Sequence, residues 1–126
     1  MKSDFIQSYR DLIVWQKSMD LVKVIYELTK QFPETEKFGL ISQMRRAAVS
    51  IPSNIAEGFR RGARKDYRYF LIIAFGSGAE LETQIEISKR LEFCNNFNYS
   101  KVDGLLGEIM KILNVFIKKL GNSTTT

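Results

Sequence analysis

The sequence predicts an all-α fold, an antiparallel up-down-up-down four-helix bundle. Only two prolines occur among the 126 residues, and no segment alternates apolar and polar residues as a half-buried strand does. Wherever the apolar residues are regularly spaced, they recur at intervals of three and four. Four such segments of about 20 to 30 residues, joined by short connections, favour a bundle of alternating direction. We expect one domain over residues 1–121 and a flexible tail over 122–126.

The first helix is expected over residues 11–31. It carries two adjoining apolar seams at helical spacing, which together predict a wide buried face. The seams are Leu12, Trp15, Met19, Val22 and Tyr26, and Val14, Leu21, Ile25 and Leu28. Pro33 opens the first connection, because proline disfavours a helical conformation at the residue before it.

The second helix is expected over residues 37–60, with a kink at Pro52. Proline inside a helix removes one backbone hydrogen bond and costs about 3 kcal/mol unless packing offsets it. The predicted buried face is Leu40, Met44, Ala47, Ile51, Ile55 and Gly58. Val49 and Ala56 lie outside this face, near Arg45. They form a second, weakly apolar strip that fits contact with another subunit, although ordinary scatter of surface alanine and valine gives the same pattern.

Gly62 marks the corner before the third helix, which is expected over residues 64–93. Its predicted inner face is Tyr67, Phe70, Ala74, Ser77, Leu81, Gln84 and Ser88. Small residues near its centre would let another helix approach closely, and they are Ala74, Gly76, Ser77, Gly78 and Ala79. Ser100 suits the N-cap of the fourth helix. The predicted inner face of that helix is Leu105, Ile109, Ile112, Phe116 and Leu120.

The composition argues against an enzyme. The absence of histidine removes Ser-His-Asp and Cys-His catalysis, histidine metal sites and the Glu-x-x-His motif of di-iron bundles. Cys94 is the only cysteine, so no intrachain disulfide can form. Glu82 and Glu86 share a helix face but Glu80 does not, which favours a salt-bridged or solvated face over a magnesium site. We expect no catalytic residue, no metal and no cofactor.

The chain shows no segment suited to a membrane. Its longest apolar run is too short to span one, and its first residues lack the apolar core of a leader peptide. We therefore expect a soluble, cytoplasmic protein without a membrane partner.

All of the excess positive charge lies in one segment. The chain has a net charge of +5, and Arg45 to Arg68 holds seven basic residues against two acidic ones, while the remainder is balanced. We name the C-terminal part of this segment the basic corner, and it consists of Arg60, Arg61, Arg64, Lys65, Arg68 and Tyr69. Arg64 and Lys65 stand in the first turn of a helix, where the helix dipole disfavours cations, so we expect another partner for them.

Three interpretations fit the basic corner. RNA, DNA or another polyanion could bind there, and Tyr69, the more exposed of two nearby tyrosines, could stack on a base. Alternatively, Arg64 and Arg68 could pair with Glu82 and Glu86 of a neighbouring subunit, since all four fall on one helix face. The corner could also be solvated, with no partner at all.

Five motifs stand out along the chain. They are Tyr9-Arg-Asp-Leu-Ile-Val-Trp15, Gln43-Met-Arg-Arg-Ala-Ala-Val-Ser-Ile-Pro-Ser-Asn-Ile-Ala-Glu-Gly58, Phe70-Leu-Ile-Ile-Ala74, Gly76-Ser77 and Glu80-Leu-Glu-Thr-Gln84. Together they resemble the 23S ribosomal RNA intervening-sequence protein family, over nearly the whole chain. The resemblance implies a four-helix bundle that assembles as a homopentameric ring. No enzymatic activity or catalytic residue is established for the family, so the resemblance implies none here. One departure is Ala63, where related sequences often carry serine or threonine.

The family is distantly similar to the accessory proteins of diversity-generating retroelements, which form basic pentamers that bind nucleic acid and a reverse transcriptase. By analogy, the implied partners are the chain itself, RNA or DNA, and another nucleic-acid-processing protein. We expect a non-enzymatic homopentamer that binds nucleic-acid backbone through the basic corner. The alternative is a scaffold whose basic corner makes intersubunit salt bridges. The residues expected in an oligomer interface or a structural polar network are Arg45, Val49, Asn54, Ala56, Glu57, Glu82 and Glu86.

Overall fold

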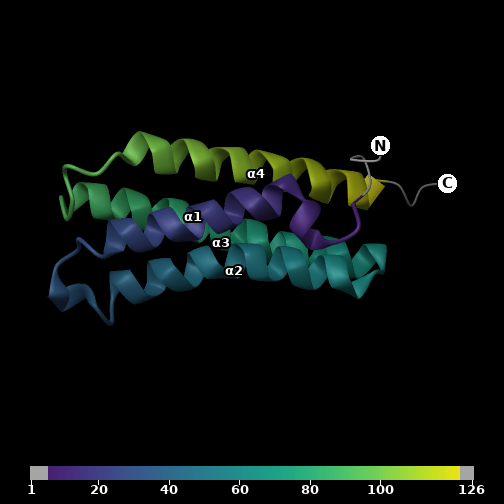
Figure 1. The fold of residues 1–126 in the computed structure, drawn as a ribbon, viewed down its shortest axis with the longest axis horizontal. Coiled ribbons are helices and arrows are strands. Elements are labelled where there is room, and N and C mark those ends of the chain that lie inside the picture. The colour runs from purple at the N-terminus through teal and green to yellow at the C-terminus, as the bar shows by residue number, and fades with distance from the viewer. Residues whose placement is uncertain (1–5, 123–126) are drawn as a thin grey trace.

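The structure is a computed structural model that describes residues 6–122, and in this range it confirms the all-α four-helix bundle (Figure 1). The elements in order are η1 (Tyr9–Asp11), α1 (Ile13–Thr29), η2 (Glu34–Glu36), α2 (Leu40–Arg61), α3 (Arg64–Arg90) and α4 (Tyr99–Asn122). The α-helices lie lengthwise beside one another, and successive helices run in opposite directions. Each helix contacts the next one along the chain, and α4 returns to contact α1.

The two ends of the bundle differ in what they hold. The α1–α2 and α3–α4 connections lie at one end, as Figure 1 shows. The other end gathers η1, the corner between α2 and α3, and the C-terminus of α4. Because the basic corner belongs to this second end, its charges lie beside the last turn of α4 rather than alone at the tip of the bundle.

Only one of the two seams expected in the core is buried on α1. Leu21, Ile25 and Leu28 are fully buried, whereas Met19 is 45% exposed and Tyr26 is 42% exposed. The expectation of one wide buried face on this helix is therefore wrong. In a bundle of four helices each helix packs against only part of its circumference, so the second seam is only partly covered: Leu12 is buried, Trp15 and Val22 pack against the core, and Tyr26 lies under Arg45 of α2.

The buried face predicted for α2 is confirmed, from Leu40 through to Gly58. Pro52 lies inside the helix and is itself buried, and the helix continues through it without a break. Gly58 allows α3 to pack closely, since a Cβ there would lie 2.8 Å from the Cβ of Phe70. Gly62 ends the helix with a φ of 81°, a backbone conformation that favours glycine.

The inner face predicted for α3 is confirmed in part, whereas that of α4 is rotated from its predicted position. On α3, Ala74, Leu81, Gln84 and Ser88 are buried as predicted. Leu71, Gly78 and Ile85 are buried as well, while Tyr67, Phe70 and Ser77 are only half-buried. On α4 the buried residues are Val102, Leu106, Ile109 and Leu113, of which only Ile109 was expected. Both helices carry apolar residues on more than one side, so spacing alone did not define the buried line. Among the small residues of α3, Gly78 lets α4 approach closely, because a Cβ there would overlap the sulfur of Met110.

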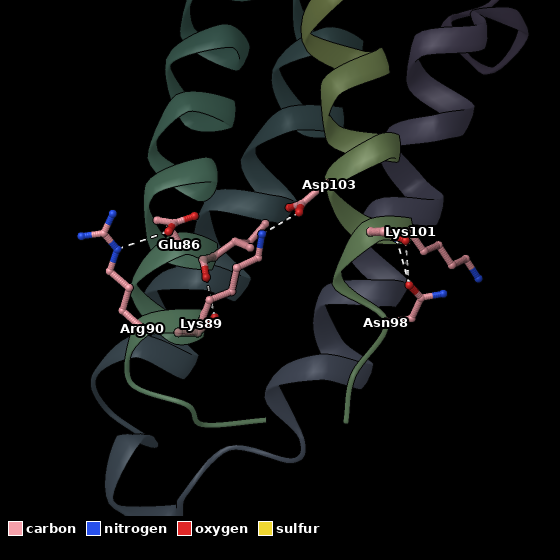
Figure 2. Close-up of polar contacts among 9 residues, drawn as sticks. Glu86, Lys89, Arg90, Asn98, Lys101 and Asp103 are labelled. Carbon is pink, nitrogen blue, oxygen red and sulfur yellow. Dashed lines mark hydrogen bonds and ion pairs between the residues drawn. The ribbon is translucent and has the colours of Figure 1, made fainter. Parts of the chain in front are cut away.

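Several predicted helix ends need correction, among them the start of α2, at Leu40 instead of residue 37, and the end of α3, at Arg90 instead of residue 93. The helix predicted from residue 11 is divided, because Leu12 is extended between η1 and α1. Asn98, not Ser100, caps α4: its Oδ1 accepts from the backbone N–H of Lys101 at 3.3 Å, as Figure 2 shows. Asn122 is the last residue of α4 rather than the first of a tail, and 123–126 lie outside the described residues.

Candidate nucleic-acid interface

The turn at Gly62 brings the basic residues of two helices to one end of the bundle. Arg60 and Arg61 form the last turn of α2, and Arg64 and Lys65 the first turn of α3. All four side chains are exposed. The turn thus concentrates positive charge at the end of the molecule where α4 also terminates.

Arg64 and Arg68 bind the end of α4. Arg64 donates from Nε to the carbonyl oxygen of Leu120 at 3.1 Å and from Nη2 to that of Lys119 at 3.2 Å. Arg68 donates from Nε to the carbonyl oxygen of Ile117 at 3.0 Å. The last carbonyl groups of a helix lack partners within the helix and form the negative end of its dipole.

Arg64 therefore has a partner inside the chain. Its position at the start of α3 is unfavourable for that helix but favourable for the end of α4 beside it. The sequence suggested only partners outside the chain for Arg64, and the structure adds one within it. Lys65 differs, because it forms no hydrogen bond or ion pair with any residue between 6 and 122.

A surface groove of about 530 Å³ runs between the start of α3 and the end of α4. Its lining residues are Arg64, Lys65, Arg68, Tyr69, Ile72, Leu120 and Gly121. Four of them were proposed from the sequence as nucleic-acid-binding residues. Ile72, Leu120 and Gly121 were not, because no charge or motif distinguishes them. Tyr69 is 60% exposed, and its ring meets that of Phe70 edge-on at 5.2 Å between centroids.

Arg60 and Arg61 do not line this groove. Arg61 donates from Nε and Nη2 to Glu57 Oε2 at 3.1 and 2.9 Å, and its guanidinium lies 4.9 Å from the ring centroid of Phe70. The guanidinium of Arg60 lies 5.6 Å from the ring centroid of Tyr9 in η1. The basic corner is thus divided into a groove beside α4 and two arginines outside it, Arg60 against η1 and Arg61 against α2 and α3.

Asn54 belongs to a polar network between α2 and α3. Its Nδ2 donates to the carbonyl oxygen of Ser50 at 2.8 Å and to Ser50 Oγ at 2.9 Å. Ser50 Oγ in turn lies 2.7 Å from Ser77 Oγ on α3. These contacts join the two helices within one chain.

The carboxylates proposed for intersubunit pairing lie toward the other end of α3 from Arg64. Glu86 accepts from Arg90 Nε at 3.2 Å, one turn along the same helix (Figure 2). Nearby, Lys89 donates to Asp103 Oδ2 at 2.6 Å and joins α3 to α4. This hydrogen bond raises the pKa of the Lys89 amine. Within one chain, then, neither Glu82 nor Glu86 meets the basic corner.

A set of six apolar or aromatic residues on α1 and α2 is left at least partly exposed. It consists of Trp15, Met19, Val22 and Tyr26 on α1, and of Val49 and Ala56 on α2. We name it the α1/α2 strip. Arg45 borders it, with its guanidinium 4.3 Å from the ring centroid of Tyr26 and Nε donating to Thr29 Oγ1 at 2.9 Å. The sequence pointed to Val49 and Ala56 here but assigned the α1 residues to the core.

Other features of the described residues favour neither metal nor membrane chemistry. No three histidine, cysteine, aspartate or glutamate residues in the described part of the chain are grouped closely enough to hold a metal ion. A groove of about 430 Å³ between α1 and α4 is lined by charges of both signs, among them Lys23, Glu27 and Glu108. Of the helices between residues 6 and 122, none combines the length and apolar character needed to cross a membrane.

Comparison with known proteins agrees with this architecture. The model of the family described as 23S rRNA-intervening sequence protein matches residues 10–115. A crystal structure of a protein with unknown function from the S23 ribosomal protein family of Bacteroides thetaiotaomicron is 30% identical, with a TM-score of 0.76. The match covers 84% of this chain and 96% of that one. No curated protein matches the chain.

Proposed function

The chain belongs to the 23S rRNA-intervening sequence protein family, which confirms the resemblance seen in its motifs, and from this premise we propose that it is a non-enzymatic homopentamer that binds the backbone of RNA or DNA. The observation that carries the proposal is the groove in which Arg64, Lys65 and Arg68 converge beside the end of α4. A groove within the segment that holds all of the excess positive charge is suited to a polyanion.

The guanidinium groups in the groove can bind phosphate without leaving α4. A guanidinium has five N–H donors, of which Arg64 uses two and Arg68 one in their bonds to the α4 carbonyl oxygens. The remaining donors stay available, and the bonds to α4 hold both groups in place. Pre-positioned donors bind a phosphate with less loss of side-chain entropy than free side chains do.

Further cations lie at the same end of the bundle. Arg10 belongs to η1, and Lys119 to the last turn of α4. Both are exposed. They enlarge the positive field around the groove, which would increase the rate at which a polyanion is captured.

The α1/α2 strip supports self-association. Met19, Tyr26 and Val49 are exposed although apolar or aromatic, and the bordering Arg45 is held by Thr29 and Tyr26. Such a surface is stabilised by contact with a second copy. In a ring whose axis follows the bundle, every basic corner would face the same rim, so several weak phosphate contacts would act together.

The scaffold alternative has less support. It needs Arg64 and Arg68 to pair with Glu82 and Glu86 of a neighbour. The N–H donors that both arginines have left could serve a carboxylate as well as a phosphate, but Glu86 already accepts from Arg90. Replacing both glutamates by glutamine tests it directly. An unchanged mass by light scattering would contradict the scaffold, and dissociation would favour it.

The nucleic-acid proposal is tested by the salt dependence of binding, using fluorescence anisotropy with labelled RNA and DNA. The double variant Arg60→Gln, Lys65→Gln removes two charges but leaves the bonds of Arg64 and Arg68 to α4 intact. Its slope of log affinity against log salt should fall by about 0.7 to 0.9 for each phosphate that the variant no longer neutralises.

The matched control is Lys30→Gln, Lys101→Gln, which removes the same charge at the opposite end of the bundle. This variant should keep the slope of the unaltered protein. Absence of binding at low salt would overturn the proposal, and so would an equal loss of slope in both double variants.

A further inference from the structure

The groove at the end of α4 is not purely cationic. Tyr69, Ile72 and Leu120 line it together with the three basic residues. A site that contacts only the phosphates of a duplex gains nothing from an exposed aromatic ring, because the bases of a duplex are stacked on one another. A single strand exposes both its phosphates and the faces of its bases.

The cations and the apolar residues are presented side by side on α3. Lys65, Tyr69 and Ile72 occupy positions i, i+4 and i+7 of the helix, so they lie along one face. Arg68 borders that face and, with Arg64, is fixed by α4. A strand that passes along the groove would thus meet the cations and the tyrosine ring within two helical turns.

The tyrosine is both accessible and supported. Its side chain is 60% exposed, and its ring has one aromatic neighbour, Phe70, at an angle of 82°. Edge-on contact of this kind restrains the ring without covering it on all sides. Stacking of a base on such a ring is tolerant of sequence, since every base has an aromatic face.

We propose that the groove takes single-stranded nucleic acid, with its phosphates on Arg64, Lys65 and Arg68 and a base stacked on Tyr69. The inference rests on the proposed function, because it assigns the form of nucleic acid that the same site binds. It adds that single strands bind more tightly than duplexes, and that the difference depends on the ring of Tyr69. The pattern of cationic groove and aromatic platform is the one that sequence-tolerant single-strand binding requires.

The test compares labelled single strands of about 12 nucleotides with a duplex of the same sequence, as DNA and as RNA, by fluorescence anisotropy. Single strands should bind more tightly than the duplex. Tyr69→Leu should weaken single-strand binding by roughly 5- to 150-fold, the range expected for the loss of one stacked base. Tyr69→Phe should restore most of it, because phenylalanine keeps the aromatic face.

Two further measurements separate stacking from a general loss of binding. Tyr69→Leu removes no charge, so the slope of log affinity against log salt should stay unchanged. Phe38→Leu is the matched control, because Phe38 is 89% exposed and lies outside the groove. It should leave single-strand binding unchanged.

The outcomes distinguish this inference from the proposed function. Equal affinity for duplex and single strand, unaffected by Tyr69→Leu, would overturn single-strand stacking while leaving backbone binding in place. No binding of either form at low salt would overturn both. Different affinities for DNA and RNA single strands, each lowered by Tyr69→Leu, would support the inference and identify the preferred sugar.

Discussion

Arg68 occupies the space that a side chain at Gly121 would take: a Cβ on Gly121 would lie 2.8 Å from Arg68 Nε. The same Nε donates to the carbonyl oxygen of Ile117 at 3.0 Å. The absence of a side chain in the last turn of α4 therefore lets α3 hold that turn. This relationship links the stability of the helix end to the position of a cation in the groove.

Gly121→Ala should displace the guanidinium of Arg68 and weaken its bond to Ile117. A hydrogen bond from a charged donor contributes about 1.5 to 3 kcal/mol, whereas alanine in place of glycine favours a helix by up to about 1 kcal/mol. We expect the free energy of unfolding to fall by about 1 kcal/mol, measured by urea denaturation at fixed protein concentration.

The matched control for this change is Gly107→Ala, also on α4, where a Cβ would meet no atom within 4 Å. There only the helix preference acts, so stability should rise by about 0.5 to 1 kcal/mol. Equal shifts in the two variants would show that Arg68 does not depend on the space beside Gly121.

Ala63→Ser should stabilise the protein. Ala63 is the N-cap of α3, with φ −80° and ψ 136°, and it supplies no side-chain hydrogen bond. A serine in this extended conformation could accept from a free backbone N–H of the first turn, which contributes about 0.5 to 2 kcal/mol. The midpoint of thermal unfolding should rise. Ala63→Val, which has no oxygen to accept the bond, should not raise it.

Ionisation of the Tyr67 phenol should lower the stability of the protein at alkaline pH. Burial raises the pKa of its phenol above the ordinary value of 10.0. The phenol therefore loses its proton at a lower pH in the unfolded chain than in the folded one. Its contribution to the free energy of unfolding is fully present below pH 10.0 and is lost as the pH rises further. The raised pKa of Lys89, caused by its hydrogen bond to Asp103, acts in the same direction.

Denaturation curves at increasing pH check this expectation. In Tyr67→Phe the phenol is absent, so the fall in unfolding free energy above pH 10.0 should be shallower than in the unaltered protein. The same fall in both proteins would show that the Tyr67 phenol contributes nothing to it.

The basic corner could be predicted from the sequence, but the contacts that hold its side chains in place could not. Arg60, Arg61, Arg64 and Lys65 are near neighbours in the chain, so their charge was visible at once. The contact between Arg64 and Leu120 joins residues 56 positions apart, and its acceptor is a backbone carbonyl oxygen. Every residue except the last carries such a group, so no sequence pattern marks the ones that a distant arginine will meet.

The errors in predicting which residues are buried have a different cause. On α2 the buried line was correct, since arginine, serine and glutamate residues separate its apolar stripe from the rest of the helix. On α1 the seam of Trp15 to Tyr26 is as apolar as the buried seam beside it. Apolar spacing shows which residues avoid water, but it does not show whether the chain itself or another copy covers them.

The α1/α2 strip supplies the last prediction, that Met19→Glu with Val49→Glu will dissociate the proposed oligomer. Both side chains are exposed on the single chain, at 45% and 40%, so two added carboxylates should not disturb the core. In an interface they would be removed from water without partners and would repel one another, which is strongly unfavourable. Light scattering should show a lower mass, while circular dichroism keeps its helical signal. Ile13→Glu is the control, because Ile13 is 60% exposed on the same helix but lies outside the strip. If the double variant keeps its mass, the strip is not the surface through which copies of the chain associate.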